Sequence, residues 1–113
     1  MTTESSVQVA VVQASPVLFD RDATVDKACQ LIDEAALQGA QLILFPEAFI
    51  PCYPRGLSFG MVVGSRSPEG RALWQRYWEN SVEVPGPATE TLGKAADAAD
   101  VYLAIGVTER ASH

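Results

Sequence analysis

Apolar and polar residues follow one another along this chain in blocks that predict strands and helices in turn. The mostly apolar run from Val7 to Ala14 predicts a first strand. A helix is predicted next, because apolar residues recur at helical spacing with charged residues between them. This apolar stripe consists of Val25, Ala28, Cys29, Ile32, Ala35 and Ala36. Asp22 suits the N-cap of that helix, and Gly39 suits its C′ position.

The later blocks predict two more strands and two more helices. Residues 41–45 predict a strand, and its consecutive apolar side chains predict burial on both faces of a sheet. Ser67 and Pro68 suit the cap and the first position of a second helix, and a third helix is predicted over residues 87–99. Residues 101–107 predict the last strand. Because strands and helices alternate, we expect an α/β fold with parallel strands and right-handed crossovers.

The second predicted helix carries a stripe of large apolar side chains. Leu73, Trp74, Tyr77 and Trp78 fall on one side of it at helical spacing. Such a stripe favours packing against the parent domain. Contact with another subunit is the alternative, because Trp and Tyr are enriched at the hot spots of protein interfaces.

The end of the strand predicted over residues 41–45 suggests chemistry. Pro46 cannot donate to a sheet ladder, so Glu47 follows at the carboxyl end of the strand, between Phe45 and Phe49. Parallel open sheets bind ligands outside the carboxyl ends of their strands, and apolar surroundings make a carboxylate a stronger base. Glu47 is therefore a candidate catalytic residue. From spacing alone, a surface glutamate in a turn or a structural ion pair is the alternative.

The segment that contains Glu47 resembles part of a known protein family. The run Phe45-Pro-Glu-Ala-Phe-Ile-Pro-Cys-Tyr-Pro-Arg-Gly-Leu-Ser-Phe-Gly60 closely resembles the segment of nitrilases that carries their catalytic glutamate. Tyr53-Pro54-Arg55-Gly56 favours the nitrilase branch of the carbon–nitrogen hydrolases over the amidase branches. The resemblance extends over nearly the whole chain, from Val7 to Arg110. Its other matches are Val9–Ala14, Glu34–Ala40, Val84–Pro87 and Val101–Gly106.

The resemblance to nitrilases implies a fold and an activity. The implied fold is a four-layer α-β-β-α sandwich, and residues 1–113 are expected to form the N-terminal part of that single domain, with residues 1–6 disordered. The implied reaction hydrolyses a nitrile to a carboxylic acid and ammonia through a cysteine thioimidate and thioester, with Glu47 as the general base. Tyr53 matches a position where nitrilases commonly place a tyrosine in the substrate pocket, and a structural loop tyrosine is the alternative. No metal and no organic cofactor is implied.

The resemblance covers only the opening part of the nitrilase catalytic domain. The family's lysine lies beyond the strand that ends near Glu109, and its nucleophilic cysteine lies further on. We therefore expect this chain to be inactive alone and to need the remainder of the domain or a complementary chain. A catalytically inactive, truncated chain that acts as an assembly or regulatory partner is the alternative. The resemblance also implies a homo-oligomer, a dimer that often extends into a spiral.

Cys52 departs from the family pattern, because relatives often carry glycine or alanine there. A thiol five residues from Glu47 allows a rival scheme in which Cys52 is the nucleophile. The resemblance disfavours this scheme, because it places the family's nucleophile at a later strand end. No helix N-terminus is predicted to orient the Cys52 thiol either.

Composition excludes several classes of function. Hydrophobic residues make up 48% of the chain, and 14 acidic against 8 basic side chains give a net charge of −6, which disfavours nucleic acid as a partner. No apolar run approaches the roughly 18 residues of a membrane span, and no leader pattern is visible, so a cytoplasmic location is the default expectation.

Cys29 and Cys52 match neither a metal site nor a disulfide framework. Residues 13–18 lack the Gly-x-Gly-x-x-Gly cradle of a dinucleotide-binding module.

Overall fold

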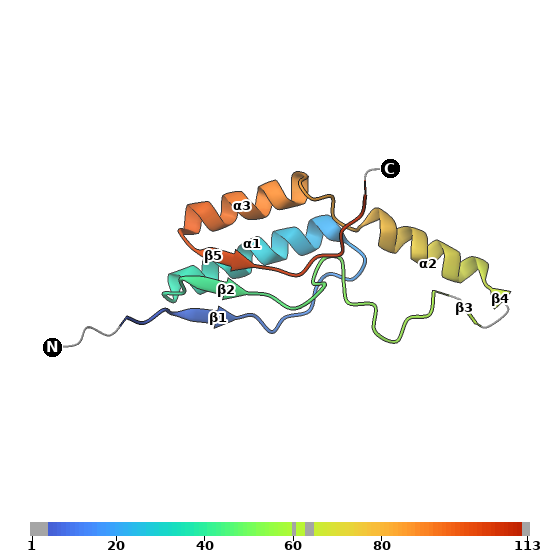
Figure 1. Cartoon of the computed structure of the whole chain (residues 1–113), viewed down its shortest axis with the longest axis horizontal. Helices are drawn as coiled ribbons and strands as arrows, with labels where there is room; N and C mark the ends of the chain where they lie inside the picture. Colours follow the sequence, from blue (N-terminus) through green and yellow to red (C-terminus); the bar gives the residue numbers. More distant parts are fainter. Residues whose placement is uncertain (1–4, 60, 63–64, 112–113) are drawn as a thin grey trace.

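A parallel three-stranded sheet with helices on one face forms the body of the molecule (Figure 1). The computed structural model describes residues 5–59, 61–62 and 65–111. The sheet has the order β1-β2-β5, with β1 spanning Val9–Val11, β2 Leu42–Leu44 and β5 Tyr102–Ala104. Helices α1 (Arg21–Leu37) and α3 (Pro87–Ala99) cover it, and the small antiparallel pair β3 (Met61–Val62) and β4 (Ser65–Arg66) precedes α2 (Pro68–Glu79).

The predicted α/β alternation is confirmed, although the strands are shorter than the sequence predicted. The first strand was predicted from Val7 to Ala14, but β1 pairs with β2 over three residues only. Ser5 and Ser6 lie outside any helix or strand, and the other four residues of the predicted disordered end lie outside the described residues. In the described part of the chain, no helix is both long enough and apolar enough to cross a membrane.

The start of α1 differs from the prediction and its end agrees with it. Asp20, not Asp22, is the N-cap, because its Oδ1 accepts a hydrogen bond of 3.0 Å from the Ala23 amide. Asp22 lies in the first turn, where its negative charge interacts favourably with the helix dipole. Its carboxylate also pairs with Arg21 at 3.1 Å. Gly39 follows the helix with a φ of +95°, a left-handed conformation that glycine adopts without strain.

The two faces of the sheet have different surroundings. Ala10, Ile43 and Leu103 are in register across the three strands and belong to the core that the helices cover. The prediction that the second strand is buried on both faces is wrong for Leu44, which is 44% exposed, because no described element covers the other face. The exposed apolar side chains on that face are Val9, Val11, Leu44 and Tyr102. The chain thus supplies one helical layer and one sheet layer, and a four-layer sandwich places its second sheet on such a face.

The core lies between the sheet and the helices and confirms the apolar stripe predicted for α1. Val25, Ala28 and Ile32 of α1 are buried, and Leu92 of α3 packs into the same cluster. The other buried members are Ile43, Phe45, Phe49, Ile50 and Val82. Most of these residues follow β2, so the segment that leaves the sheet is itself anchored in the core.

Helix α2 lies beyond the carboxyl ends of the strands (Figure 1). Its predicted start is confirmed, because the Ser67 hydroxyl accepts a hydrogen bond of 3.1 Å from the Gly70 amide at the N-terminus. Tyr77 packs into the body and is only 6% exposed. Trp74 meets the Phe59 ring edge to face with centroids 5.5 Å apart, and the Arg110 guanidinium lies 4.8 Å from the centre of the Trp78 ring. Both tryptophans remain about half-exposed, so packing against the parent domain is confirmed fully for Tyr77 and in part for the two tryptophans.

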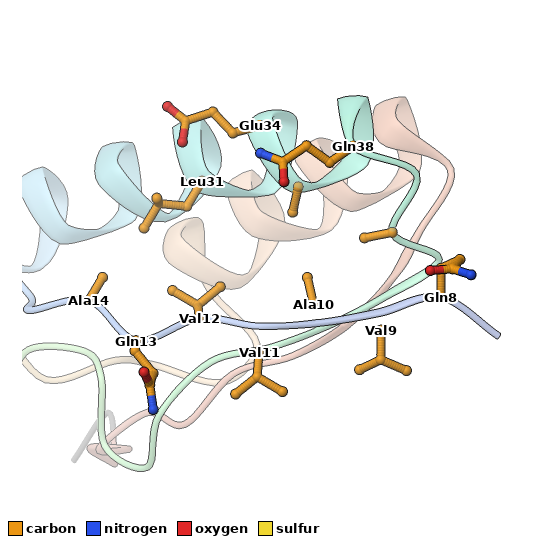
Figure 2. A pocket seen from close by; sticks show the side chains of 12 residues that line it. Gln8, Val9, Ala10, Val11, Val12, Gln13, Ala14, Leu31, Glu34 and Gln38 are labelled. Carbon is orange, nitrogen blue, oxygen red and sulfur yellow. The ribbon is translucent and has the colours of Figure 1, made fainter.

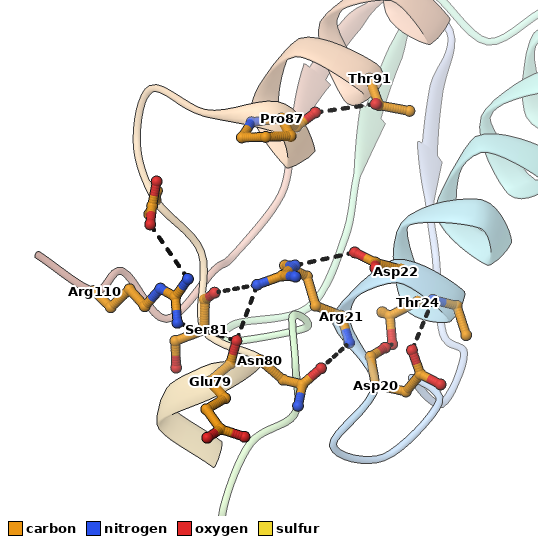
Figure 3. Close-up of polar contacts among 12 residues, drawn as sticks. Asp20, Arg21, Asp22, Thr24, Glu79, Asn80, Ser81, Pro87, Thr91 and Arg110 are labelled. Carbon is orange, nitrogen blue, oxygen red and sulfur yellow. Dashed lines mark hydrogen bonds and ion pairs between the residues drawn. The ribbon is translucent and has the colours of Figure 1, made fainter. Parts of the chain in front are cut away.

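Two arginines fasten the C-terminal end of α2 to the body (Figure 3). Arg21 Nη1 donates to the carbonyl oxygens of Glu79 at 3.0 Å and Ser81 at 3.3 Å. Arg110 Nη1 donates to the Glu79 carbonyl at 3.2 Å, and its Nη2 pairs with Glu83 at 3.2 Å. Cationic side chains satisfy the free carbonyl groups of a helix C-terminus and interact favourably with its dipole. The position of α2 is therefore tied to the start of α1 and to the segment that follows β5.

Candidate catalytic glutamate

Glu47 stands where the chain leaves β2, at the carboxyl end of the sheet. Phe45 before it and Phe49 after it are buried, and their rings meet edge to face with centroids 5.3 Å apart. Glu47 itself is exposed. The sequence predicted apolar surroundings for this carboxylate, but the two rings belong to the core while Glu47 faces outward. The aromatic side chains therefore anchor the backbone on both sides of Glu47, and the carboxylate is presented to the space outside the strand end.

Gly106, which was named from the sequence only as the last residue of a run matching the family, lies directly against the backbone of Glu47. The Gly106 amide donates to the Pro46 carbonyl at 3.2 Å, and the Ile50 amide donates to the Gly106 carbonyl at 3.3 Å. A Cβ atom on residue 106 would lie 2.4 Å from the Ala48 nitrogen, 2.6 Å from the Pro46 oxygen and 2.7 Å from the Glu47 Cα. Real Cβ atoms essentially never approach other atoms within 3.0 Å. Only glycine fits at this position without displacing the segment that carries Glu47.

Residues 47–49 form a bulge between two stretches of parallel pairing. Before the bulge, the Phe45 amide donates to the Ala104 carbonyl at 2.8 Å, and after it Ile50 bridges Val107. Within it, Ala48 has a φ of +47°, a left-handed conformation that costs a residue with a side chain on the order of 1–3 kcal/mol. Strain of this kind persists only where the surrounding structure holds it, and it is frequent at functional sites.

Tyr77 holds the connection that follows the bulge. Its hydroxyl donates to the Cys52 carbonyl at 3.1 Å and shares a hydrogen bond of 2.8 Å with the Thr108 hydroxyl. The Thr108 amide in turn donates to the Ile50 carbonyl at 2.9 Å. Tyr77 was predicted from its helical spacing to pack against the domain, and this polar role was missed. The available signal was a tyrosine, rather than a phenylalanine, on the buried side of a helix.

The Cys52 side chain is buried, with 2% of its surface exposed. Burial raises the pKa of its thiol, and a backbone hydrogen bond from Phe19 lowers it by a smaller amount. The thiolate is the reactive form, so a buried thiol with a raised pKa is a poor nucleophile at neutral pH. The structure therefore argues against the rival scheme in which Cys52 attacks the substrate.

Alkylation should show this low reactivity directly. In the folded protein, Cys52 should react with iodoacetamide much more slowly than it does after denaturation. Because its pKa is raised, the rate should increase only above the pH range of an ordinary thiol. Mass spectrometry of the labelled peptide from about pH 6 to about pH 10 measures this. Rapid labelling of Cys52 near neutral pH would restore it as a candidate nucleophile.

Tyr53 lies on the same connection as Glu47 and follows the buried Cys52. Its side chain is 57% exposed, and its carbonyl accepts a hydrogen bond of 2.8 Å from the Arg55 amide. The ring is thus accessible to a ligand, and its role in substrate binding stays a prediction. Among the described residues, no group of three His, Cys, Asp or Glu side chains is arranged to hold a metal ion.

A cavity of about 400 Å³ lies between the first strand segment and α1 (Figure 2). Ala10, Val12 and Ala14 point from the first strand segment toward α1, and Leu31 and Gln38 face them from the helix. In the described sheet, β1 is an edge strand, so its outer side lacks a neighbouring strand. The cavity is the space beside this unpaired edge of the sheet, and its lining includes neither Glu47 nor Tyr53.

Comparison with known proteins gives matches over almost the whole chain. A family model described as carbon-nitrogen hydrolase matches residues 8–113. The chain is 50% identical over 103 residues to an aliphatic nitrilase of Sinorhizobium fredii, covering 91% of this chain and 33% of that protein. It is 47% identical over 105 residues to a bifunctional nitrilase/nitrile hydratase of Nicotiana tabacum, covering 93% of this chain and 30% of that protein. For nitrilase 3 of Arabidopsis thaliana the identity is 47% over 106 residues, with coverage of 94% and 31%. The chain thus spans about a third of the length of these relatives.

Proposed function

Since the chain belongs to the carbon–nitrogen hydrolase family, we propose that it forms part of a nitrilase, which hydrolyses a small nitrile to a carboxylic acid and ammonia. The resemblance to nitrilases predicted from the sequence is confirmed by relatives that are 47–50% identical over most of the chain. One observation supports assigning the general-base role to a particular residue. The family match runs through Glu47, and this carboxylate stands exposed at the carboxyl end of β2, where parallel sheets bind their ligands.

In the proposed mechanism Glu47 handles the protons of a cysteine nucleophile. The carboxylate takes the proton of the thiol, the thiolate attacks the nitrile carbon, and the proton passes to the nitrile nitrogen to give a thioimidate. Glu47 then activates a water that adds to the thioimidate carbon, and the tetrahedral intermediate expels ammonia and leaves a thioester. A second water cleaves the thioester, which releases the carboxylic acid and regenerates the thiol.

The remaining groups of this mechanism come from outside these residues. A lysine stabilises the negative charge that develops on the substrate, and both the lysine and the nucleophilic cysteine are supplied by the remainder of the domain or by a complementary chain. Burial of the Cys52 thiol supports assigning the nucleophile elsewhere. Tyr53 is proposed as a wall of the substrate pocket, supported by its exposed ring on the connection that carries Glu47. Homo-oligomeric assembly and a cytoplasmic location stay predictions of the sequence analysis.

Nitrile hydrolysis tests the proposal. The complete enzyme should release ammonia and acid from members of a panel of aromatic, aliphatic and arylaceto nitriles, and intact-mass measurement should detect a covalent adduct with substrate. The isolated 113-residue chain should release neither product, because its carboxylate has no cysteine partner at the strand end.

Three results would contradict these expectations. A complete enzyme that cleaves amides and no nitrile would overturn the nitrilase proposal while leaving the family unchanged. Nitrile hydrolysis by the isolated chain would overturn the claim that the lysine and the cysteine come from elsewhere. An inactive complete enzyme that binds an active relative would instead support the alternative of an assembly or regulatory partner.

A further inference from the structure

We propose that Gly106 is a positioning residue for the Glu47 carboxylate, because its bare backbone sets where the segment carrying Glu47 lies. The proposal rests on the proposed function, in which Glu47 is the general base. The glycine follows β5, so it lies 59 positions further along the chain than the residue that it positions. Gly106 acts only through the contacts of its own backbone with that segment.

The contacts of Gly106 lie on both sides of Glu47. Its amide donates to the carbonyl of Pro46, and its carbonyl accepts from the amide of Ile50, at 3.2 and 3.3 Å. Glu47 lies along the chain between these two hydrogen bonds, and its exposed side chain has no hydrogen bond or ion pair with any described residue. The location of the carboxylate is therefore determined by the backbone of the bulge, and Gly106 is the residue against which that backbone rests.

The bulge has little freedom to move away from a side chain at residue 106. The three atoms that a Cβ would meet, in Pro46, Glu47 and Ala48, all belong to the backbone, so no flexible side chain can yield. Phe45 and Phe49 are buried at either end of the bulge and fix it in the core. A methyl group would have to displace these atoms by about 1 Å, and a misplacement of that size costs a catalytic group about 100-fold in rate.

Gly106→Ala in the complete enzyme tests the proposal. The kcat for nitrile hydrolysis should fall about 100-fold, while KM stays within about threefold, because the substrate pocket is kept and the base is displaced. Iodoacetamide alkylation of the nucleophilic cysteine should also require a higher pH, because the displaced carboxylate no longer assists loss of the thiol proton. The matched control is Gly93→Ala in α3, where a Cβ would meet nothing within 4 Å, and both kinetic constants should be unchanged.

A second variant keeps the test decisive if Gly106→Ala fails to fold. Adding Ala48→Gly relieves the left-handed residue of the bulge, whose φ is +47°, and lets the peptide rotate away from the new methyl group. The double variant should fold, and its kcat should remain low because Glu47 is still displaced. A folded single or double variant with normal kcat would overturn the proposal. Activity that is lost only in proportion to folded protein would also overturn it, because Gly106 would then be merely structural.

Glu47→Gln, measured under the same conditions, distinguishes a failure of this proposal from a failure of the proposed function. If Glu47→Gln keeps normal turnover, the general-base role fails, and the positioning role fails with it. If Glu47→Gln is inactive while folded Gly106→Ala has normal kcat and an unchanged alkylation profile, only the positioning role fails.

Discussion

Glu47→Gln in the complete enzyme should lower nitrile turnover by at least the roughly 10²–10⁴-fold that general acid–base catalysis contributes. The amide keeps the size of the side chain and one acceptor oxygen but cannot take a proton from the thiol or from water. Folding should survive, because Glu47 is exposed and has no hydrogen bond or ion pair with any described residue. The measurement is kcat from ammonia release, together with thermal melting and oligomer size.

Two other glutamates serve as controls for the loss of one negative charge. Glu69 and Glu90 lie exposed in the first turns of α2 and α3, far along the chain from the bulge. Their glutamine variants should keep normal turnover and change the free energy of unfolding by no more than about 1 kcal/mol, the scale of a charge near a helix N-terminus. Near-normal turnover of correctly assembled Glu47→Gln would make this carboxylate a structural group and remove the residue on which the proposed mechanism depends.

Phe49→Ala should destabilise the complete enzyme by about 3–5 kcal/mol, the cost expected for truncating a large aromatic side chain in a core. Phe49 is 2% exposed and packs edge to face on Phe45, so its removal leaves a cavity beneath the bulge that carries Glu47. We expect a lower midpoint of chemical denaturation and less soluble protein. Turnover per folded molecule should also fall, because one of the two anchors of the bulge is lost.

Ile32→Val provides the matched control for that core. Ile32 is fully buried in the same cluster, and the variant removes one methyl group, which costs about 0.5–1.5 kcal/mol. The denaturation midpoint of Phe49→Ala should therefore lie well below that of Ile32→Val. Equal midpoints would show that Phe49 does not anchor the bulge in the assembled enzyme.

Signals carried by neighbouring residues predicted the helices well. The third helix was predicted over residues 87–99 and α3 spans Pro87–Ala99, while Ser67 caps α2 and Gly39 ends α1 as expected. Each of these features depends on side chains within one helical turn of the boundary. The cap of α1 was misplaced from Asp20 to Asp22, because both carboxylates suit a helix start and only the folded backbone shows which one reaches the Ala23 amide.

The amino-acid sequence by itself determined the alternation of strands and helices, the family resemblance and the candidate glutamate, because these depend on spacing and on consecutive residue types. Tertiary structure decided what surrounds that glutamate. It buried the Cys52 thiol, placed the Tyr77 hydroxyl on the Cys52 carbonyl, left Leu44 uncovered and set Gly106 against the Glu47 backbone. Each of these contacts or exposures depends on how segments distant along the chain pack and on the register between strands. Local propensity carries no information about which residue of a later strand will contact an earlier one.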